Sequence, residues 1–212
     1  MKIAVIGATG KQGGLIVQEA LKRGHQVTAI VRNRSKVSSN LVSVIEKDIF
    51  KITADDVRGF DAVVDAFRAS EGHEEDHITS LQHLIQVFES LPEVRLLIVG
   101  GAGSLYVDKD KKLQLVNSEG FPDLYKPTAL NMAKAFDLLK KSSANWTYLS
   151  PSAEFDFTGT RTGSYILGDD NLTVNTKGES YISYADYAIA MVDEIEKNAH
   201  VRKRFTVAAE RA

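Results

Sequence analysis

The chain has 212 residues, of which 43% are hydrophobic and 25% are charged. This composition is that of a globular protein rather than a disordered chain, and at roughly 150 residues per domain it predicts one domain spanning residues 1–212. The 26 basic and 28 acidic residues give a net charge of −2, so the chain has no positive field to hold nucleic acid. The absence of cysteine excludes disulfides and thiolate metal sites and suits a reducing cytoplasm.

The N-terminal segment predicts a strand, a glycine turn and a helix. The apolar run Ile3–Ile6 has the length of a strand, far short of a signal-peptide core or a membrane span. It is followed by Gly7-Ala8-Thr9-Gly10-Lys11-Gln12-Gly13, and the apolar residues between 15 and 21 then recur at helical spacing. Glycines at such a turn let the backbone approach a diphosphate, which the N–H groups of the helix bind. The alternative is a plain turn without a ligand.

The second predicted strand, Val27–Val31, ends in basic residues. Arg32-Asn33-Arg34 follows it, at the position where NAD-selective sites carry an acidic residue for the ribose 2′-hydroxyl. A guanidinium can instead clamp a 2′-phosphate, so we predict that Arg32 and Asn33 bind the adenosine end of NADP(H). A solvated basic turn is the alternative. Asp48, after a candidate strand at Leu41–Ile45, is expected to accept from the adenine amino group or to form only a turn.

The next predicted strand, Ala62–Val64, precedes a motif that resembles a zinc site. His73-Glu74-Glu75-Asp76-His77 matches H-E-x-x-H, yet it contains no apolar residue and follows Gly72. The apolar helical stripe begins only at Ile78. We therefore expect a surface or lid segment leading into a helix, and no metal site. A further strand is predicted at Leu96–Val99.

The second half of the chain predicts two further helices and two strands. Helical spacing covers Asn131–Lys141 and Tyr184–Lys197, and the strands are Trp146–Leu149 and Phe205–Val207. Strands alternating with helices predict a doubly wound parallel α/β sheet in three α/β/α layers. The loop-rich segments at about 101–128 and 151–181 are then expected to form the substrate loops, because sites in such folds lie at the carboxyl ends of the strands.

Several segments carry a family resemblance that spans nearly the whole chain. The glycine turn with Arg32 and Asp48 resembles atypical short-chain dehydrogenases that bind NAD(P) on a Rossmann fold. Later segments narrow this resemblance to bacterial NADH-flavin reductases, relatives of biliverdin reductase B. These segments are Trp146–Pro151, Gly159–Gly163, Tyr181–Ala188 and Arg204–Val207.

The resemblance implies a cofactor site at the ends of the strands. It would place the diphosphate on the glycine turn, at Gly7, Thr9, Gly10, Lys11, Gln12 and Gly13. It would place the ribose beside Ala66, Phe67 and Arg68. The nicotinamide would lie near Gly100, Gly101, Ala102 and Ser104, with Pro151 and Ser152 closing over it.

The Tyr-x-x-x-Lys pair, which protonates carbonyl substrates in ordinary short-chain dehydrogenases, is absent. None of the seven tyrosines is followed by lysine four positions later, and the position four residues before Lys134 holds Leu130. Alcohol–ketone chemistry is therefore disfavoured, as is epimerase or dehydratase chemistry on a nucleotide sugar. Hydride transfer to a flavin needs no such acid.

We therefore expect an NADPH-dependent oxidoreductase that passes a hydride to a planar acceptor: a flavin such as FMN or FAD, used as substrate, a quinone or a tetrapyrrole. Phe155, Phe157 and Tyr165 are predicted to form an aromatic wall for it, or else a small satellite core. Ser104 and Lys134 are the candidate catalytic groups, with structural roles as the alternative. A non-catalytic NADP(H)-binding redox sensor is the second hypothesis. No nucleic acid or membrane partner is expected, and the sequence leaves the oligomeric state open.

Overall fold

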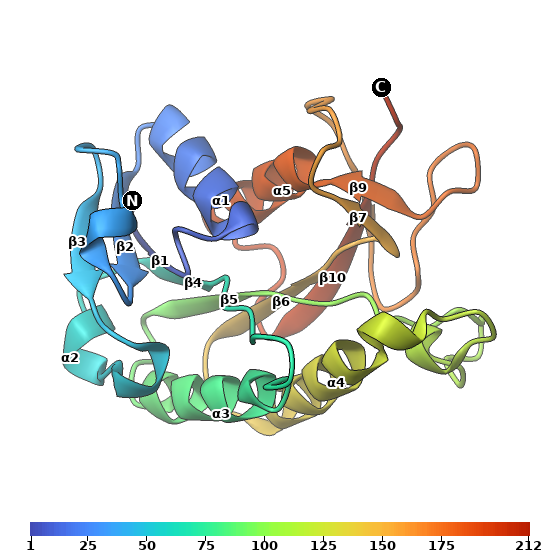
Figure 1. The fold of residues 1–212 in the computed structure, drawn as a ribbon, viewed down its shortest axis with the longest axis horizontal. Coiled ribbons are helices and arrows are strands. Elements are labelled where there is room, and N and C mark those ends of the chain that lie inside the picture. The colour runs from blue at the N-terminus through green and yellow to red at the C-terminus, as the bar shows by residue number, and fades with distance from the viewer.

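A computed structural model describes all residues, 1–212, and is built around an eight-stranded sheet (Figure 1). The spatial order of the strands is β3-β2-β1-β4-β5-β6-β10-β8. Their bounds are β1 Lys2–Ile6, β2 Gln26–Val31, β3 Ser43–Glu46, β4 Ala62–Asp65, β5 Arg95–Val99, β6 Trp146–Ser150, β8 Ile166–Gly168 and β10 Lys203–Ala208. All neighbours pair in parallel except β10 and β8. The strand order reverses at β1, which pairs with both β2 and β4, so the carboxyl ends of β1 and β4 flank a crevice.

Helices cover both faces of the sheet. Their bounds are α1 Lys11–Lys22, α2 Ala54–Val57, α3 Asp76–Glu89, α4 Lys126–Lys141 and α5 Tyr184–Lys197. In Figure 1, α1 and α5 lie above the sheet and α2, α3 and α4 lie below it. Successive side chains of β1 point to opposite faces of the sheet and pack against the two helical layers. Ile3 and Val5 pack with α1 and α5, whereas Ala4 and Ile6 pack with α3 and α4.

The predicted α/β/α fold is confirmed, with three differences in detail. Helix α4 begins at Lys126 rather than Asn131, because Pro127 occupies its first turn, where a proline costs no hydrogen bond. The segment 151–181 contains an antiparallel edge strand, β8. It also contains β7 (Glu154–Asp156), which pairs with β9 (Tyr181–Ser183) in a separate two-stranded sheet. None of the helices has the length and apolarity needed to span a membrane.

Candidate functional site

The glycine turn bends tightly between β1 and α1. Gly7 has a φ of +71°, a conformation that favours glycine, and its N–H donates to the carbonyl of Ile30 at 3.2 Å. The N–H of Gly10 donates back to the Gly7 carbonyl at 2.8 Å, and Gly10 caps the start of α1. The first N–H groups of α1 have no partners within the helix, which makes them available to an anion.

The turn leaves no space for side chains at two of its glycines. A Cβ atom on Gly13 would lie 2.3 Å from the Gly7 carbonyl oxygen, and one on Gly7 would lie 2.7 Å from the carbonyl oxygen of Ala66. The glycine turn is therefore pressed against both its own helix and the segment that follows β4. These contacts fit a backbone cradle for a dinucleotide diphosphate.

Two side chains of the turn link it to α5 and to an aromatic ring. The buried Gln12 donates through Nε2 to the carbonyl of Tyr184 at 3.3 Å, while its Oε1 has no hydrogen-bond partner within the chain. An unpaired buried acceptor beside an open cradle fits a ligand that brings a donor. The ammonium group of Lys11 lies 4.3 Å from the ring centroid of Phe157.

The residues expected at the adenosine end lie after β2 and β3. Arg32 is exposed at the carboxyl end of β2. Asn33 accepts hydrogen bonds from the N–H and the hydroxyl of Ser35, and Asp48 accepts from the Phe50 N–H at 3.0 Å. Asn33 and Asp48 thus cap short 3₁₀ turns, so the turn-forming role considered for Asp48 is present.

The loops after β4 and β5 border the same crevice. The N–H of Ala66 donates to the Ile6 carbonyl, and the N–H of Phe67 donates to Asp65, while Arg68 is exposed. After β5, Gly100 packs so closely on Tyr148 that a Cβ atom would lie 2.2 Å from its ring. The next N–H, that of Gly101, donates to the Tyr148 hydroxyl at 3.2 Å.

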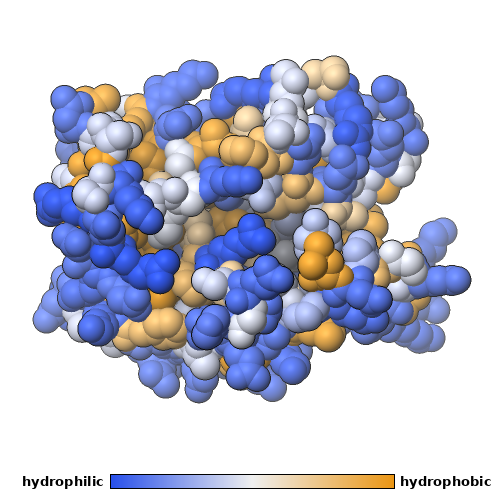
Figure 2. Space-filling view, in the orientation of Figure 1, coloured by the Kyte–Doolittle hydropathy of each residue, from blue (hydrophilic) through white to orange (hydrophobic).

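A cavity of about 360 Å³ begins at these loops. Gly101, Ala102, Pro151 and Ser152, all expected near the nicotinamide, line one part of it together with Phe155. The rest is lined by the predicted substrate segment 101–128 and the first turns of α4. Figure 2 shows that this face of the molecule is hollowed between the two helical layers, with apolar side chains inside the hollow. We call the cavity of about 360 Å³ the acceptor cavity.

The two candidate catalytic residues lie outside the lining of this cavity. Ser104 is buried, and both its hydroxyl and its carbonyl oxygen accept from the guanidinium of Arg204, at 2.9 and 3.0 Å. Its geometry therefore supports the structural alternative, in which Arg204 holds the loop after β5. Lys134 is exposed on α4. Neither residue is brought next to the glycine cradle.

Two of the three predicted aromatic residues, Phe155 and Phe157, lie around the ring of Tyr184, and of these rings only that of Phe155 lines the acceptor cavity. Phe155 lies 3.9 Å from Tyr184 between ring centroids, and Phe157 lies 5.5 Å from the same ring. Tyr165 does not join them, because its hydroxyl donates to Asp193 on α5 at 2.7 Å. Tyr184 was not among the residues predicted for this site. The available signal was its place in the segment Tyr181–Ala188, which carries the family resemblance.

Electrostatics link Tyr184 to both sides of the crevice. Burial raises the pKa of Tyr184, while the charge of Arg68 acts to lower it and Tyr125 acts to raise it. Arg68 follows β4 and Tyr125 precedes α4. Tyr125 also lines the acceptor cavity.

The buried Asp186 holds together two of the segments that carry the family resemblance. Its carboxylate accepts from the N–H groups of Thr162 and Gly163 and from the hydroxyls of Thr162 and Ser183. The adjacent Arg161 pairs with Glu19 on α1 at 2.6 Å. The segments Gly159–Gly163 and Tyr181–Ala188 therefore form one anchored unit between α1 and α5.

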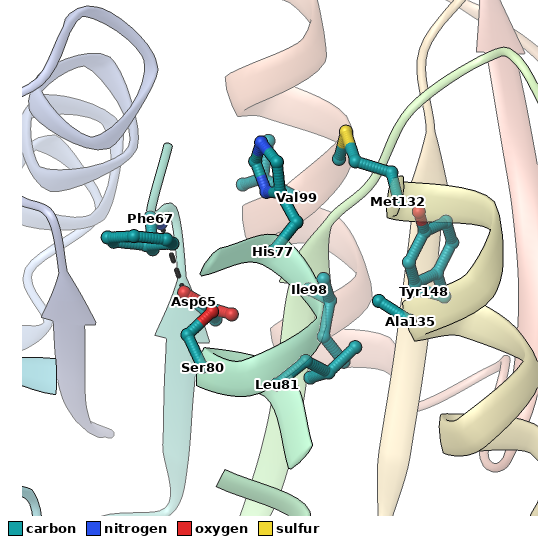
Figure 3. A pocket seen from close by; sticks show the side chains of 10 residues that line it. All are labelled: Asp65, Phe67, His77, Ser80, Leu81, Ile98, Val99, Met132, Ala135 and Tyr148. Atoms are coloured by element: carbon teal, nitrogen blue, oxygen red, sulfur yellow. Dashed lines mark hydrogen bonds between the residues drawn. The ribbon is translucent and has the colours of Figure 1, made fainter. Parts of the chain in front are cut away.

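A second, smaller cavity of about 20 Å³ lies between α3, α4 and the ends of β4 and β5 (Figure 3). Asp65 and His77 line it, and Met132 belongs to the lining of both cavities. Burial raises the pKa of Asp65 to about 6, against the one hydrogen bond from Phe67. Burial also lowers the pKa of His77, whose Nε2 has no partner within the chain.

The H-E-x-x-H segment does not have the geometry of a zinc site. His73 is exposed and precedes α3, whereas His77 lies within α3 and is only 8% exposed. The two rings therefore do not share a helix face. The expectation of a surface segment is wrong for His77, because its ring packs edge-on against Phe67 at 6.0 Å.

The glycine cradle, the switch in strand order and the cavity beside it define a dinucleotide-binding protein of the Rossmann type. A family model described as NAD(P)H-binding matches residues 7–198, and the chain belongs to this family. An uncharacterized protein of Bacillus subtilis strain 168, YwnB, is 53% identical over 211 residues, which cover 99% of both chains.

Solved structures agree with this family membership. The crystal structure of SP1627 from Streptococcus pneumoniae TIGR4, described as a "putative NADH-flavin reductase", is 45% identical with a TM-score of 0.94, and the match covers 99% of this chain and 100% of that one. The predicted resemblance is thereby confirmed. ChuY from Escherichia coli O157:H7, described as an anaerobillin reductase, shares the fold at 17% identity with a TM-score of 0.76, and the match covers all of both chains.

Proposed function

We propose that this protein is an NADPH-dependent oxidoreductase that reduces a planar acceptor bound in the acceptor cavity. The observation that carries the proposal is the position of this cavity. Its lining includes Gly101, Ala102, Pro151 and Ser152, the residues expected beside the nicotinamide, and continues along the segment 115–132. A cavity of this size, with mostly apolar and neutral walls, suits a small ring system.

The chain's own residues would bind and orient the two reactants. The N–H groups at the start of α1 would hold the diphosphate, and Arg32 would pair with the 2′-phosphate. Bound NADPH supplies the hydride. Pro151 and the Phe155–Tyr184 pair would exclude water and fix the planes of the rings, which is how orientation lowers a barrier.

The cavity lining contains neither candidate catalytic residue, Ser104 or Lys134, and no lysine; its hydroxyl groups are those of Ser118, Tyr125, Thr128 and Ser152. This lining lacks the Tyr-Lys pair of carbonyl reduction, which supports an acceptor that needs no dedicated acid from the protein. A flavin or quinone spreads the incoming charge over its ring and can take its proton from water. The descriptions of two similar structures, a "putative NADH-flavin reductase" and an anaerobillin reductase, agree with planar acceptors as a class.

The test is a binding titration followed by an acceptor screen. We expect the protein to bind NADPH more tightly than NADH and to oxidise NADPH steadily when a flavin or a quinone is added. Loss of NADPH absorbance measures turnover. Tight NADPH binding with no turnover of any flavin, quinone or tetrapyrrole would replace this proposal with the redox-sensor hypothesis.

A further inference from the structure

The acceptor cavity has an unusual charge composition for a site proposed to serve flavins. Seventeen residues line it, and Glu119 is the only one with a charged side chain. No lysine, arginine or histidine lines it. Glu119 is exposed, and no ion pair joins it to a cation of the chain. A phosphate, sulfonate or carboxylate bound here would find no counter-charge and would face one carboxylate.

The remaining walls are apolar or neutral. Phe121, Pro122 and Tyr125 come from the segment before α4, and Met132 and Phe155 line the cavity from α4 and β7. The Thr128 hydroxyl in the first turn of α4 is half-buried, lines the cavity and makes no hydrogen bond within the chain. It can donate to a carbonyl oxygen of a ligand.

None of the three cations discussed for the cofactor, Lys11, Arg32 and Arg68, lines the acceptor cavity. Lys11 lies over the ring of Phe157 beside the glycine cradle. The positive charge of Arg68 acts to lower the pKa of both His77 and Tyr184. Arg32 lies at the end of β2. These three positive charges match the phosphates of a dinucleotide. Once they are paired, the bound cofactor adds negative charge next to the acceptor cavity.

We propose that the acceptor is an uncharged ring carbonyl compound, a quinone or a flavin ring without its phosphate, and that Glu119 selects against anionic acceptors. The proposal rests on the reductase function proposed above. In the reaction, the quinone gains two electrons and one hydrogen as hydride from bound NADPH, which becomes NADP⁺. One proton from water completes the hydroquinone.

The test compares naphthoquinone with its ring sulfonate, which differ by one negative charge on the same ring. Calorimetry on NADP⁺-saturated protein measures binding of each, and NADPH oxidation measures turnover of each. We expect naphthoquinone to bind at least about tenfold more tightly. Glu119→Gln should narrow this gap by about fivefold, the effect of one unit charge at close range in a partly solvated site. Asp110→Asn, which removes a charge from the same segment outside the cavity lining, should leave the gap unchanged.

The two arms separate the two proposals. Three results would overturn the proposed selection against anions. The sulfonate could bind as tightly as naphthoquinone or more tightly, or neither compound could bind. The third result is a ratio of the two affinities that Glu119→Gln leaves unchanged. Selective binding of naphthoquinone without NADPH oxidation would support that selection and refute the reductase function. Selective binding with turnover supports both.

Discussion

Arg32 is the residue on which the nucleotide preference depends. It is exposed at the carboxyl end of β2, where the adenosine ribose of a Rossmann cofactor lies, and no acidic residue stands beside it in the chain. Its neighbour Arg34 is held locally, because its guanidinium donates to the Val44 carbonyl at 2.9 Å. The free guanidinium is therefore that of Arg32.

Arg32→Glu should weaken NADPH binding much more than NADH binding. The substitution removes a charge-assisted pair and adds repulsion, so we expect a rise of more than about tenfold in the dissociation constant for NADPH. Fluorescence titrations with the two nucleotides measure it. Arg34→Gln serves as the matched control and should change both constants little. Equal weakening of NADPH and NADH binding by Arg32→Glu would show that Arg32 does not touch the 2′-phosphate.

Asp65 makes the stability of the fold depend on pH. Its folded pKa of about 6 lies above the ordinary value of 3.8, so the folded state holds the proton more tightly. The stability that the protonated Asp65 contributes to the fold is fully present at pH values below the ordinary pKa and is lost as the pH rises through about 6. The difference between the folded and the ordinary pKa of Asp65 corresponds to ~3 kcal/mol of unfolding free energy.

Asp65→Asn should remove the cost of burying a charged carboxylate at this position. Asparagine keeps an oxygen that can accept from the Phe67 N–H but carries no charge to desolvate. We expect the variant to be more stable than the parent protein by ~1–3 kcal/mol at neutral pH and nearly equal to it near pH 4. Urea unfolding at both pH values measures the difference. A stability gain that is the same at both values would contradict the raised pKa.

At the scale of elements, the junction between the glycine turn and α1 leaves no room at Gly13. Gly13→Ala would place a methyl group 2.3 Å from the backbone oxygen of Gly7, so the turn must move. We expect a loss of at least about tenfold in NADPH affinity and ~1–3 kcal/mol of stability. Titration and urea unfolding provide the measurements.

The next glycine provides the control for this change. A Cβ atom on Gly14 would lie 3.6 Å from the Ala8 oxygen, an ordinary contact. Because alanine is favoured over glycine inside a helix, Gly14→Ala should stabilise the protein by ~0.5–1 kcal/mol and leave NADPH affinity unchanged. If both alanine variants bound NADPH like the parent protein, the cradle would not require the close packing at Gly13.

The elements that the sequence predicts well are those with a strong local pattern. Tyr184–Lys197 was expected as a helix and forms α5 with these bounds, because its apolar positions recur at helical spacing and Ser183 caps its start. The short strands β7, β8 and β9 carry no such pattern. Their pairing is set by β10 and by one another, which only the folded chain brings together.

The same distinction applies to the candidate site. The glycine turn could be located from the sequence because its spacing follows from local backbone requirements. The roles of Ser104 and Tyr165 could not, because they depend on Arg204 and Asp193, which lie far along the chain. The burial of His77 likewise depends on its packing against Phe67. Side-chain partners at long sequence separation leave no periodic signal.

At the scale of the whole molecule, a buried ion pair joins the central sheet to α5. Arg95, on β5, donates to Glu194 at 2.8 Å, and both side chains are less than one-tenth exposed. Burial lowers the pKa of Arg95, and Glu194 acts to raise it. Glu194 also accepts from the ring of His200, in the turn before β10.

Glu194→Gln should therefore destabilise the fold strongly. It leaves the Arg95 guanidinium buried without a counter-charge, and we expect a loss of ~3–5 kcal/mol, measured by urea unfolding. The double variant Arg95→Met with Glu194→Gln removes the uncompensated charge and should recover part of that loss. Failure of the double variant to be more stable than the single one would mean that packing, rather than charge, dominates at this position.

Met132 lies between the small cavity that holds Asp65 and His77 and the acceptor cavity. Its side chain lines both cavities, and its sulfur lies 3.0 Å from the position of a Cβ atom on Gly101. Because Met132 is the residue that both linings share, Met132→Ala is expected to widen the connection between the two cavities and to expose Asp65, whose pKa burial raises to about 6, to whatever occupies the larger one.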